Sequence, residues 1–398
     1  MRVMALDISK GKSYVVVYNQ EICTDEFEVY HNQEGFNKLR NVLNKHETTV
    51  VFEATGVYSR VIERFLNTEN ISYCKLNPLL AKMQTQTLRS NKTDIVDAHK
   101  LAQSHYSFNR ELTVAQDTLY IELKDVSSLY DEIKRTLIKE RNQLHAVIQK
   151  TFPELESLFS NYLSHFALNI IKEYPHPDLI SESSRTKIKN RVLLFTKKRL
   201  SQEQAKKKAN KLISMAKLSY PSVDKNDFAV TEVQIRIDRI KNLLDTKETL
   251  AQKMIDLSLD LPEFGILTSI PGIGDLSAAL IISEVGDIRR FPTSNKMNAY
   301  IGIDIRSYQS GTLQKKDRIN KRGNAKARMI FYFIVRNMLR VQKTSPNHIV
   351  DYYYKMKKQP FNKHDKVAMV ACMNKLVKVI HFLVNTENFY DYTKSPRS

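Results

Sequence analysis

The stretch RVMALDISKGKSYVVVYN, residues 2–19, decides the fold of the N-terminal region. Its two apolar runs flank a turn at residues 10–12, which is the pattern of a β-hairpin. A third short run, FEVY at residues 27–30, extends the hairpin into a meander. Beyond it, helical patterns at residues 33–46 and 57–70 alternate with strand patterns at 48–56 and 71–77. The sequence therefore predicts an α/β domain.

The chain as a whole is strongly basic. Lysine and arginine number 62 against 43 acids, a formal charge of +19 at pH 7, and this excess predicts a polyanionic partner. The polyanion is nucleic acid or an anionic membrane surface. No run approaches the roughly 18 apolar residues that span a bilayer, and the first residues lack the pattern of a signal peptide. With 398 residues, the chain has room for two or three domains.

The cysteines bear on the cellular compartment. Cys23, Cys74 and Cys372 are odd in number and far apart, which suits neither a disulfide framework nor a zinc site. We therefore expect a reducing cytoplasm.

Two long amphipathic stretches follow the α/β region. Both have the 4-3 apolar spacing of a coiled-coil seam. The first carries Leu119, Leu123, Val126, Tyr130, Ile133, Leu137, Leu144 and Val147, and the second carries Val230, Val233, Ile237, Ile240, Leu244, Ala251 and Met254. The two helices can pair with each other, pair with copies in a second subunit, or belong to an ordinary bundle. Between them, residues 151–223 are polar and basic, which is usual for a solvated helical surface.

Four acids are candidates for a catalytic metal site. Asp7 follows the apolar run VMAL and Glu53 ends the run VVFE, so both emerge at ends of predicted strands, where a site is held rigidly. Asp94 and Asp97, in KTDIVDAHKLAQ, are three apart and share one face of a predicted helix. Converging carboxylates repel unless a cation neutralises them. Oxygen ligands select Mg²⁺ or Mn²⁺, and a pair of such ions supports phosphodiester cleavage.

Each acid also has a purely structural interpretation. Asp7 suits a turn, Glu53 a salt bridge at a strand end, and Asp94 a helix cap after Thr93. The interpretation of Asp7 as a turn residue is the weakest, because its flanking residues are apolar and an unpaired buried charge is costly.

The C-terminal region begins near residue 259 and combines a glycine turn with a basic loop. IPGIGDLSAALIISEVG, residues 270–286, has the pattern of a helix-hairpin-helix whose backbone amides approach phosphate, or of a tight turn between core helices. After it, a loop around Ser310 carries basic residues suited to a phosphate backbone, namely Lys315, Lys316, Arg318, Lys321, Arg322, Lys326 and Arg328. A serine in such a loop is more often a turn residue than a nucleophile.

These motifs together resemble a known family. ALDISK with Asp7, FEATG with Glu53, KTDIVDAHKLA with Asp94 and Asp97, then IPGIG, residues 291–302 and the SG…KRGN segment are similar to the DEDD-type transposases of the insertion sequence one-ten family. This family is also called the bridge-RNA-guided recombinases and has Piv-like invertase relatives. The resemblance covers nearly the whole chain.

The resemblance implies a fold and a division of labour. Residues 1–112 would form a RuvC-like domain of the RNase H fold, residues 113–258 a coiled-coil oligomerisation region, and residues 259–398 a mainly α transposase domain. The four acids would bind Mg²⁺, or Mn²⁺. Ser310 would attack DNA and form a phosphoserine intermediate. The preceding residue is Gln309, where family members commonly have a second serine, so Ser307 is the alternative nucleophile.

The resemblance also implies partners. A dimer or tetramer would combine the serine of one chain with the acids of another. A structured RNA from the element would pair with donor and target DNA, and the protein would work at the bacterial nucleoid. Two other functions use the same features: a RuvC-like nuclease or junction resolvase that activates water, and a nonenzymatic architectural protein that binds nucleic acid. The architectural protein leaves the four acids unexplained.

Overall fold

The computed structural model describes residues 1–44, 47–85, 93–108, 110–196, 200–310 and 313–394; of residues 307–310 and 313–317 it describes the backbone only. The described chain divides into two compact units, Met1–Ala115 and Gln116–Ser398. Each unit is described separately below.

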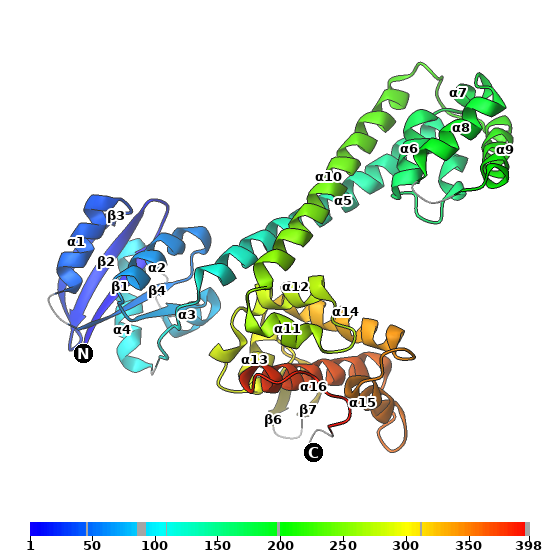
Figure 1. Ribbon diagram of the computed structural model, residues 1–398. Helices are drawn as coiled ribbons and strands as arrows, with labels where there is room; N and C mark the ends of the chain where they lie inside the picture. Colours follow the sequence, from blue (N-terminus) through cyan, green and yellow to red (C-terminus); the bar gives the residue numbers. More distant parts are fainter. Residues whose placement is uncertain (45–46, 86–92, 109, 197–199, 311–312, 395–398) are drawn as a thin grey trace. The chain divides into compact units, whose positions relative to one another are not determined.

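The first unit is built on a five-stranded mixed sheet of order β3-β2-β1-β4-β5 (Figure 1). β1 (Arg2–Ile8), β2 (Lys12–Asn19) and β3 (Ile22–Tyr30) form the predicted antiparallel meander. β4 (Thr48–Glu53) pairs in parallel with both β1 and β5 (Tyr73–Leu76). The predicted α/β architecture of this region is therefore confirmed.

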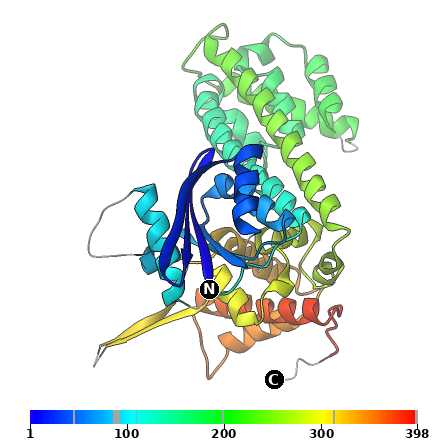
Figure 2. The ribbon, with the colours of Figure 1, turned by 90° about the vertical axis from the view of Figure 1, so that its left-hand side faces the viewer.

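Helices cover both faces of this sheet. α1 (Gln33–Leu43) and α2 (Ser59–Thr68) pack on the face that carries Met4 and Leu6. α3 (Pro78–Thr85) and α4 (Asp94–Ser107) pack on the face that carries Val3 and Ala5. Figure 2 views the sheet with these two helix pairs on opposite sides. Side chains of β1 alternate between the two faces of the sheet, and both faces are covered by helices. The sequence of β1 is therefore almost continuously apolar.

Two long helices run through the second unit. α5 (Thr118–Thr151) and α10 (Phe228–Ser258) lie side by side. Glu122 forms an ion pair with Lys253 at 3.4 Å, and Glu140 forms one with Arg236 at 3.1 Å. The two helices are therefore antiparallel. The seam that the heptad pattern predicted thus packs within one chain. Its middle part, around Ile133 and Leu244, is only half-buried.

At one end of this helix pair lies a bundle with its own apolar core. It consists of α6 (His165–Glu173), α7 (Pro177–Ser181), α8 (Arg185–Phe195) and α9 (Gln202–Leu218), packed around the ends of α5 and α10. Ser201 and Gln204 form a capping box that starts α9. The basic cluster at residues 206–208 lies on the exposed side of α9, as predicted for a solvated surface.

The other end of the helix pair joins the C-terminal core. This core contains α11 (Pro262–Thr268), α12 (Asp275–Val285), α13 (Ser294–Ile301), α14 (Ala325–Val341), α15 (His348–Lys357) and α16 (Asp365–Asn385). α16 has the length and composition of a membrane span, contrary to our expectation that no segment does, but half of its apolar window is buried inside the unit. It packs as a core helix.

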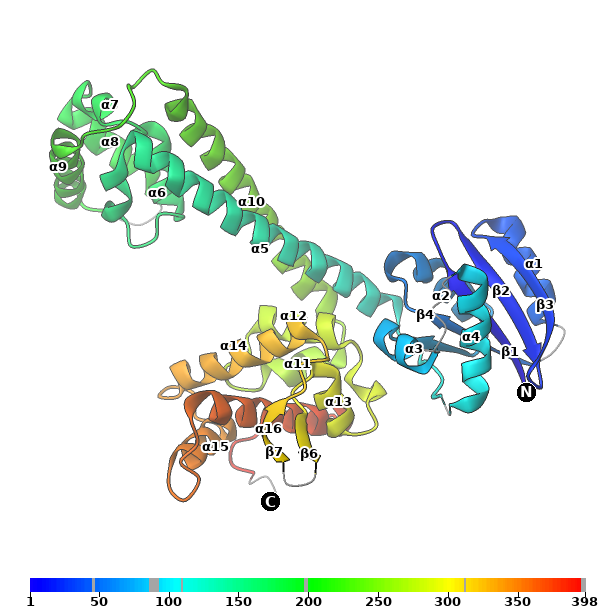
Figure 3. The ribbon, with the colours of Figure 1, turned by 180° about the vertical axis from the view of Figure 1, so that it is seen from behind.

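The basic segment around Ser310 is a β-hairpin and not the predicted loop. β6 (Ile305–Ser310) pairs antiparallel with β7 (Leu313–Ile319), with Ser310 opposite Leu313 (Figure 3). The dense charges concealed the strand pattern, because this segment has too few apolar residues to mark the two-residue period of a strand. The C-terminal region is otherwise helical, as predicted.

Candidate active site

The parallel pairing of β1 and β4 places Asp7 beside Glu53. The register pairs Leu6 with Phe52, so the next residue of each strand, Asp7 and Glu53, reaches the same edge of the sheet. Adjacent strands lie about 4.8 Å apart. Both acids are half-buried, and each makes interactions within the protein. Glu53 is the last residue of its strand, and Asp7 is the last but one.

Strand alternation gives both acids the same face. Val3 and Ala5 point toward α4, so Asp7 points to that side as well. Val51 lies in the same apolar cluster, and Glu53 follows it by two residues along β4. The two carboxylates therefore emerge on the face that α4 covers.

α4 delivers the other two acids to this edge. Its buried face includes Ala98 and Leu101, and Asp94 and Asp97 lie one turn before them on the same side. Both acids stand in the first turn, where the positive end of the helix dipole favours carboxylates. Thr93 is the N-cap, because its side chain accepts a hydrogen bond from the Val96 amide at 3.2 Å. Asp94 is thus helical and is not the cap.

The position of Lys12 indicates the end of the sheet at which α4 begins. Lys12 opens β2, which runs antiparallel to β1, so Lys12 lies where β1 ends. Its hydrogen bond and ion pair with Glu28 raise the pKa of Lys12, and attraction to Asp94 adds a smaller increase. Asp94 therefore lies at the edge of the sheet that carries Asp7 and Glu53.

The four acids lie at this edge of the sheet, but their carboxylates do not form a tight cluster. Among the residues that the structure describes, no three of them bring carboxylate oxygens within 4.8 Å of one another. Their donor atoms are all oxygens, which fits a hard divalent cation, and the side chains would turn inward to bind it.

The serine and most of the predicted basic residues lie on the β6–β7 hairpin or just after it. Ser307 and Ser310 are on β6, Lys315 and Lys316 on β7, and the side chains of all four lie outside the described part of the chain. The hairpin extends from the helices of its unit in Figure 2. Of the predicted basic residues near its base, Arg318, Lys321 and Arg322 are exposed.

Lys326 differs from these exposed residues. Its ammonium lies 2.8 Å from Asp131 Oδ2 and 3.4 Å from Glu284 Oε1, so it is already paired within the protein. Glu284 is buried and also binds Lys124 and Asn324. Burial alone raises the pKa of Glu284, but the hydrogen bonds from Lys124 and Asn324, together with the two lysine charges, hold that pKa below its usual value.

The glycine turn between α11 and α12 packs against α14. Gly272 has φ +90°, and a Cβ built on it would lie 2.6 Å from Met338 Cγ. The Asn337 side-chain amide donates to the Gly272 carbonyl at 2.9 Å. The glycine at this position is therefore required by close packing against α14. Gly274, which begins the following helix, has open space around it.

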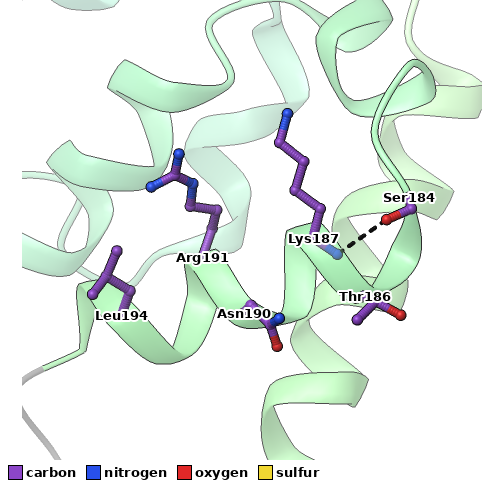
Figure 4. Close-up of a pocket in the computed structure, with 6 residues that line it drawn as sticks. All are labelled: Ser184, Thr186, Lys187, Asn190, Arg191 and Leu194. Carbon is purple, nitrogen blue, oxygen red and sulfur yellow. Dashed lines mark hydrogen bonds between the residues drawn. The ribbon is translucent and has the colours of Figure 1, made fainter.

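Two further features escaped the sequence reasoning. A pocket of about 630 Å³ runs along α8, and Figure 4 shows Lys187 and Arg191 projecting from the same side of that helix. Arg191 is paired with Glu173 at 2.9 Å, and the pocket is lined by one helix. The second feature is a group formed by Cys23, Glu26 and His99, whose spacing along the chain has no recognisable motif.

Comparisons with known proteins agree with the geometry. Residues 4–153 match the model of DEDD-type IS110 transposases, described as "Transposase". Residues 265–350 match the "Transposase IS116/IS110/IS902 family". The first match covers the α/β unit that carries Asp7, Glu53, Asp94 and Asp97, and both matches are to transposase families of the DEDD class. The chain belongs to the IS110 family of that class.

The individual relatives have low sequence identity to this chain. The transposase for insertion sequence element IS1111A of Coxiella burnetii is 31% identical over 123 residues, which are 31% of this chain and 33% of that protein. An uncharacterized protein of insertion element IS110 from Streptomyces coelicolor is 20% identical over 75% of this chain and 72% of its own length. A probable family 20 transposase of Pseudomonas aeruginosa is 26% identical over 31% of this chain and 36% of its own. The chain spans about a third of the Coxiella and Pseudomonas proteins.

Proposed function

We propose that this protein is a DNA transposase that cuts and rejoins strands at the ends of an insertion sequence and at a target. The observation that supports the proposal is that Asp7 and Glu53 end adjacent parallel strands, while Asp94 and Asp97 stand in the first turn of α4, which packs on the same face of the sheet. The family membership agrees with it. The net charge of +19 suits a DNA partner, because lysine and arginine side chains displace counterions from the phosphate backbone.

The N-terminal unit is proposed to be an RNase H-like, RuvC-like catalytic domain. Its sheet order, with an antiparallel meander followed by two parallel strands, supports this assignment. We assign residues 113–258 to a coiled-coil region for oligomerisation and residues 259–398 to the transposase domain. The turn between α11 and α12 is proposed to be a helix-hairpin-helix that contacts DNA through the open Gly274 end.

The four acids are proposed to hold a divalent cation, Mg²⁺ or Mn²⁺. When bound, such an ion polarises a phosphate oxygen and stabilises the charge that develops during phosphodiester cleavage. β1 and β4 fix Asp7 and Glu53 on rigid strand ends, while α4 holds Asp94 and Asp97 on its first turn.

Ser310 is the proposed nucleophile, with Ser307 as the alternative. The serine Oγ would form a bond to phosphorus, the bond from phosphorus to one deoxyribose oxygen would break, and that oxygen would leave as a hydroxyl carrying the serine proton. Attack by the hydroxyl of another strand on the phosphoserine would restore the serine and join the strands. The hairpin position supports this role, since a projecting ribbon can reach a partner subunit in a dimer or tetramer.

Nucleic-acid contacts are proposed at the hairpin and its base. Arg318, Lys321 and Arg322 are exposed there, and Lys315 and Lys316 lie on β7, the strand that also carries Arg318. Lys326 is included as a residue that would exchange one of its internal partners for phosphate. We further propose that an RNA encoded by the element selects the target by base pairing, and that the protein works at the bacterial nucleoid.

A trapping experiment tests this mechanism. Protein, flanking RNA and element-end DNA are incubated with Mg²⁺ and examined for a covalent protein–DNA adduct. We expect an adduct in wild type and in Ser307→Ala but none in Ser310→Ala. Loss in Ser307→Ala alone would transfer the role to Ser307. Cleavage that persists without either serine would instead indicate a junction resolvase or nuclease that uses water.

The acids are tested separately from the serine. Asp7→Asn should abolish cleavage and leave DNA binding intact, because the change removes a charge from the sheet edge without removing volume. Glu34→Gln is the matched control, since Glu34 lies in the first turn of α1, on the opposite face of the sheet. Loss of DNA binding in Asp7→Asn, or equal loss of cleavage in both variants, would contradict a catalytic role.

A further inference from the structure

A second group of metal-binding side chains lies on the α4 side of the sheet. Cys23 and Glu26 belong to β3, and His99 belongs to α4. Their ligand atoms, Sγ, a carboxylate oxygen and a ring nitrogen, all lie within 4.8 Å of one another. Within the described ranges this is the one group of three such residues that meets this distance. The sulfur and nitrogen donors separate it chemically from the four acids.

A β-bulge brings Cys23 and Glu26 onto one face. Residues three apart on a regular strand point to opposite faces. Here Val17 pairs with Asp25 while Tyr18 pairs with Cys23, so Thr24 is an extra residue in the ladder. The bulge shifts the alternation by one and turns both side chains toward α4. Bulges are known to redirect side chains beside functional sites.

The orientation of His99 is set by a second contact. Its Nδ1 lies 2.8 Å from the Tyr18 hydroxyl, and its Nε2 lies 3.1 Å from Glu26 Oε2. The Gln103 side-chain amide donates to the same hydroxyl at 3.4 Å. A histidine that binds a metal through one nitrogen usually has the other held by a hydrogen bond, which fixes the ring and its tautomer. Tyr18 supplies that hydrogen bond here.

We propose that Cys23, Glu26 and His99 form a zinc site. Zn²⁺ would bind Cys23 Sγ, one Glu26 oxygen and His99 Nε2, and water would complete a tetrahedron. Thiolate, imidazole and carboxylate are all ligands of zinc, and the thiolate disfavours Mg²⁺ and Ca²⁺. Binding would release the Cys23 thiol proton to solvent, so no oxidant or reductant is required.

The site has a structural consequence for α4. β3 is an edge strand of the sheet, and α4 carries Asp94 five residues and Asp97 two residues before His99. A zinc ion held by both elements would add metal bonds to the apolar contacts and hydrogen bonds that already join α4 to the sheet. Because its ligands are different residues, zinc binding does not depend on the proposed DNA chemistry.

Cobalt substitution tests the proposal with a readout specific for the thiolate. Full-length protein is reduced with a phosphine, freed of metal and titrated with Co²⁺ while its absorption spectrum is recorded. We expect a near-ultraviolet sulfur-to-cobalt charge-transfer band that saturates at one Co²⁺ per chain and is displaced by Zn²⁺. The four acids contribute only oxygen ligands, so Co²⁺ bound to them gives no such band.

Variants complete the test. Cys23→Ser should abolish the charge-transfer band, and His99→Gln should weaken Co²⁺ affinity at least tenfold. Asp25→Asn, on the opposite face of the same strand, is the matched control and should retain both. Far-ultraviolet circular dichroism checks that each variant is folded. Absence of the band in wild type, or its persistence in Cys23→Ser, overturns the proposal.

Discussion

Replacement of the buried Glu284 tests the charge network that joins α5, α12 and α14. Its side chain is fully buried and binds Lys124, Lys326 and Asn324. Glu284→Gln keeps the shape but leaves the two lysines without this counterion. Breaking a fully buried pair costs about 3–5 kcal/mol. The lysine side chains are 38% and 32% exposed, so water recovers part of that loss, and we expect about 2–3 kcal/mol.

The effect should depend on pH with a definite sign. Because the pKa of Glu284 is lowered in the folded protein, its contribution is fully present above 4.5, the value for an unperturbed glutamate. It is lost as pH falls through the lower, folded-state pKa. The difference in unfolding free energy between wild type and Glu284→Gln should therefore shrink as the solution is acidified below 4.5.

Urea unfolding followed by far-ultraviolet circular dichroism measures this difference. Glu248→Gln, an exposed position on α10, is the control and should change stability by no more than about 0.5 kcal/mol. A double-mutant cycle with Lys124→Met isolates the coupling between the two charges. A loss below about 0.5 kcal/mol at pH 7, or a difference that does not change on acidification, would refute the reasoning.

Two further predictions concern packing and protonation. Gly272→Ala should destabilise the second unit by about 2 kcal/mol, because the new Cβ meets Met338 at a positive φ. Gly274→Ala is the control and should lower the stability by less than about 1 kcal/mol. Equal urea midpoints for the two variants would contradict this prediction. Burial lowers the pKa of His31, so the unfolded chain binds more protons and stability should fall as pH drops below 6.5. His31→Gln should flatten that dependence in thermal unfolding, and an unchanged slope would exclude His31 as its source.

The sheet and the long helices were accessible to sequence reasoning for physical reasons. Apolar runs separated by a lysine–glycine turn define the meander, and the 4-3 spacing of α5 and α10 defines their seam. Whether that seam would pair within the chain or between chains could not be known, because both arrangements bury the same residues. The ion pair between Glu140 and Arg236 shows pairing within the chain.

Features that depend on tertiary contact were not predictable. The strands of the basic hairpin carry too few apolar residues to show their period. The sequence left open whether the turn at Gly272 serves phosphate approach or only joins core helices, and its packing against Met338 becomes visible only with α14 in place. The spacing of Cys23 along the sequence argued against a zinc site, and only the bulge at Thr24 and the arrival of α4 bring Glu26 and His99 beside it.

The antiparallel pair of α5 and α10 has a mechanical consequence. Each helix runs without a break from one apolar core into another: Tyr120 and Met254 belong to the C-terminal core, Leu144 and Val233 to the bundle. At 1.5 Å per residue, the 34 residues of α5 span about 50 Å. If the pair moves as a rigid rod, tilting it by about 5° at one core displaces the other by about 4 Å. A small shift of the helices around Glu284 would thus produce a larger displacement of the bundle at the other end of the pair.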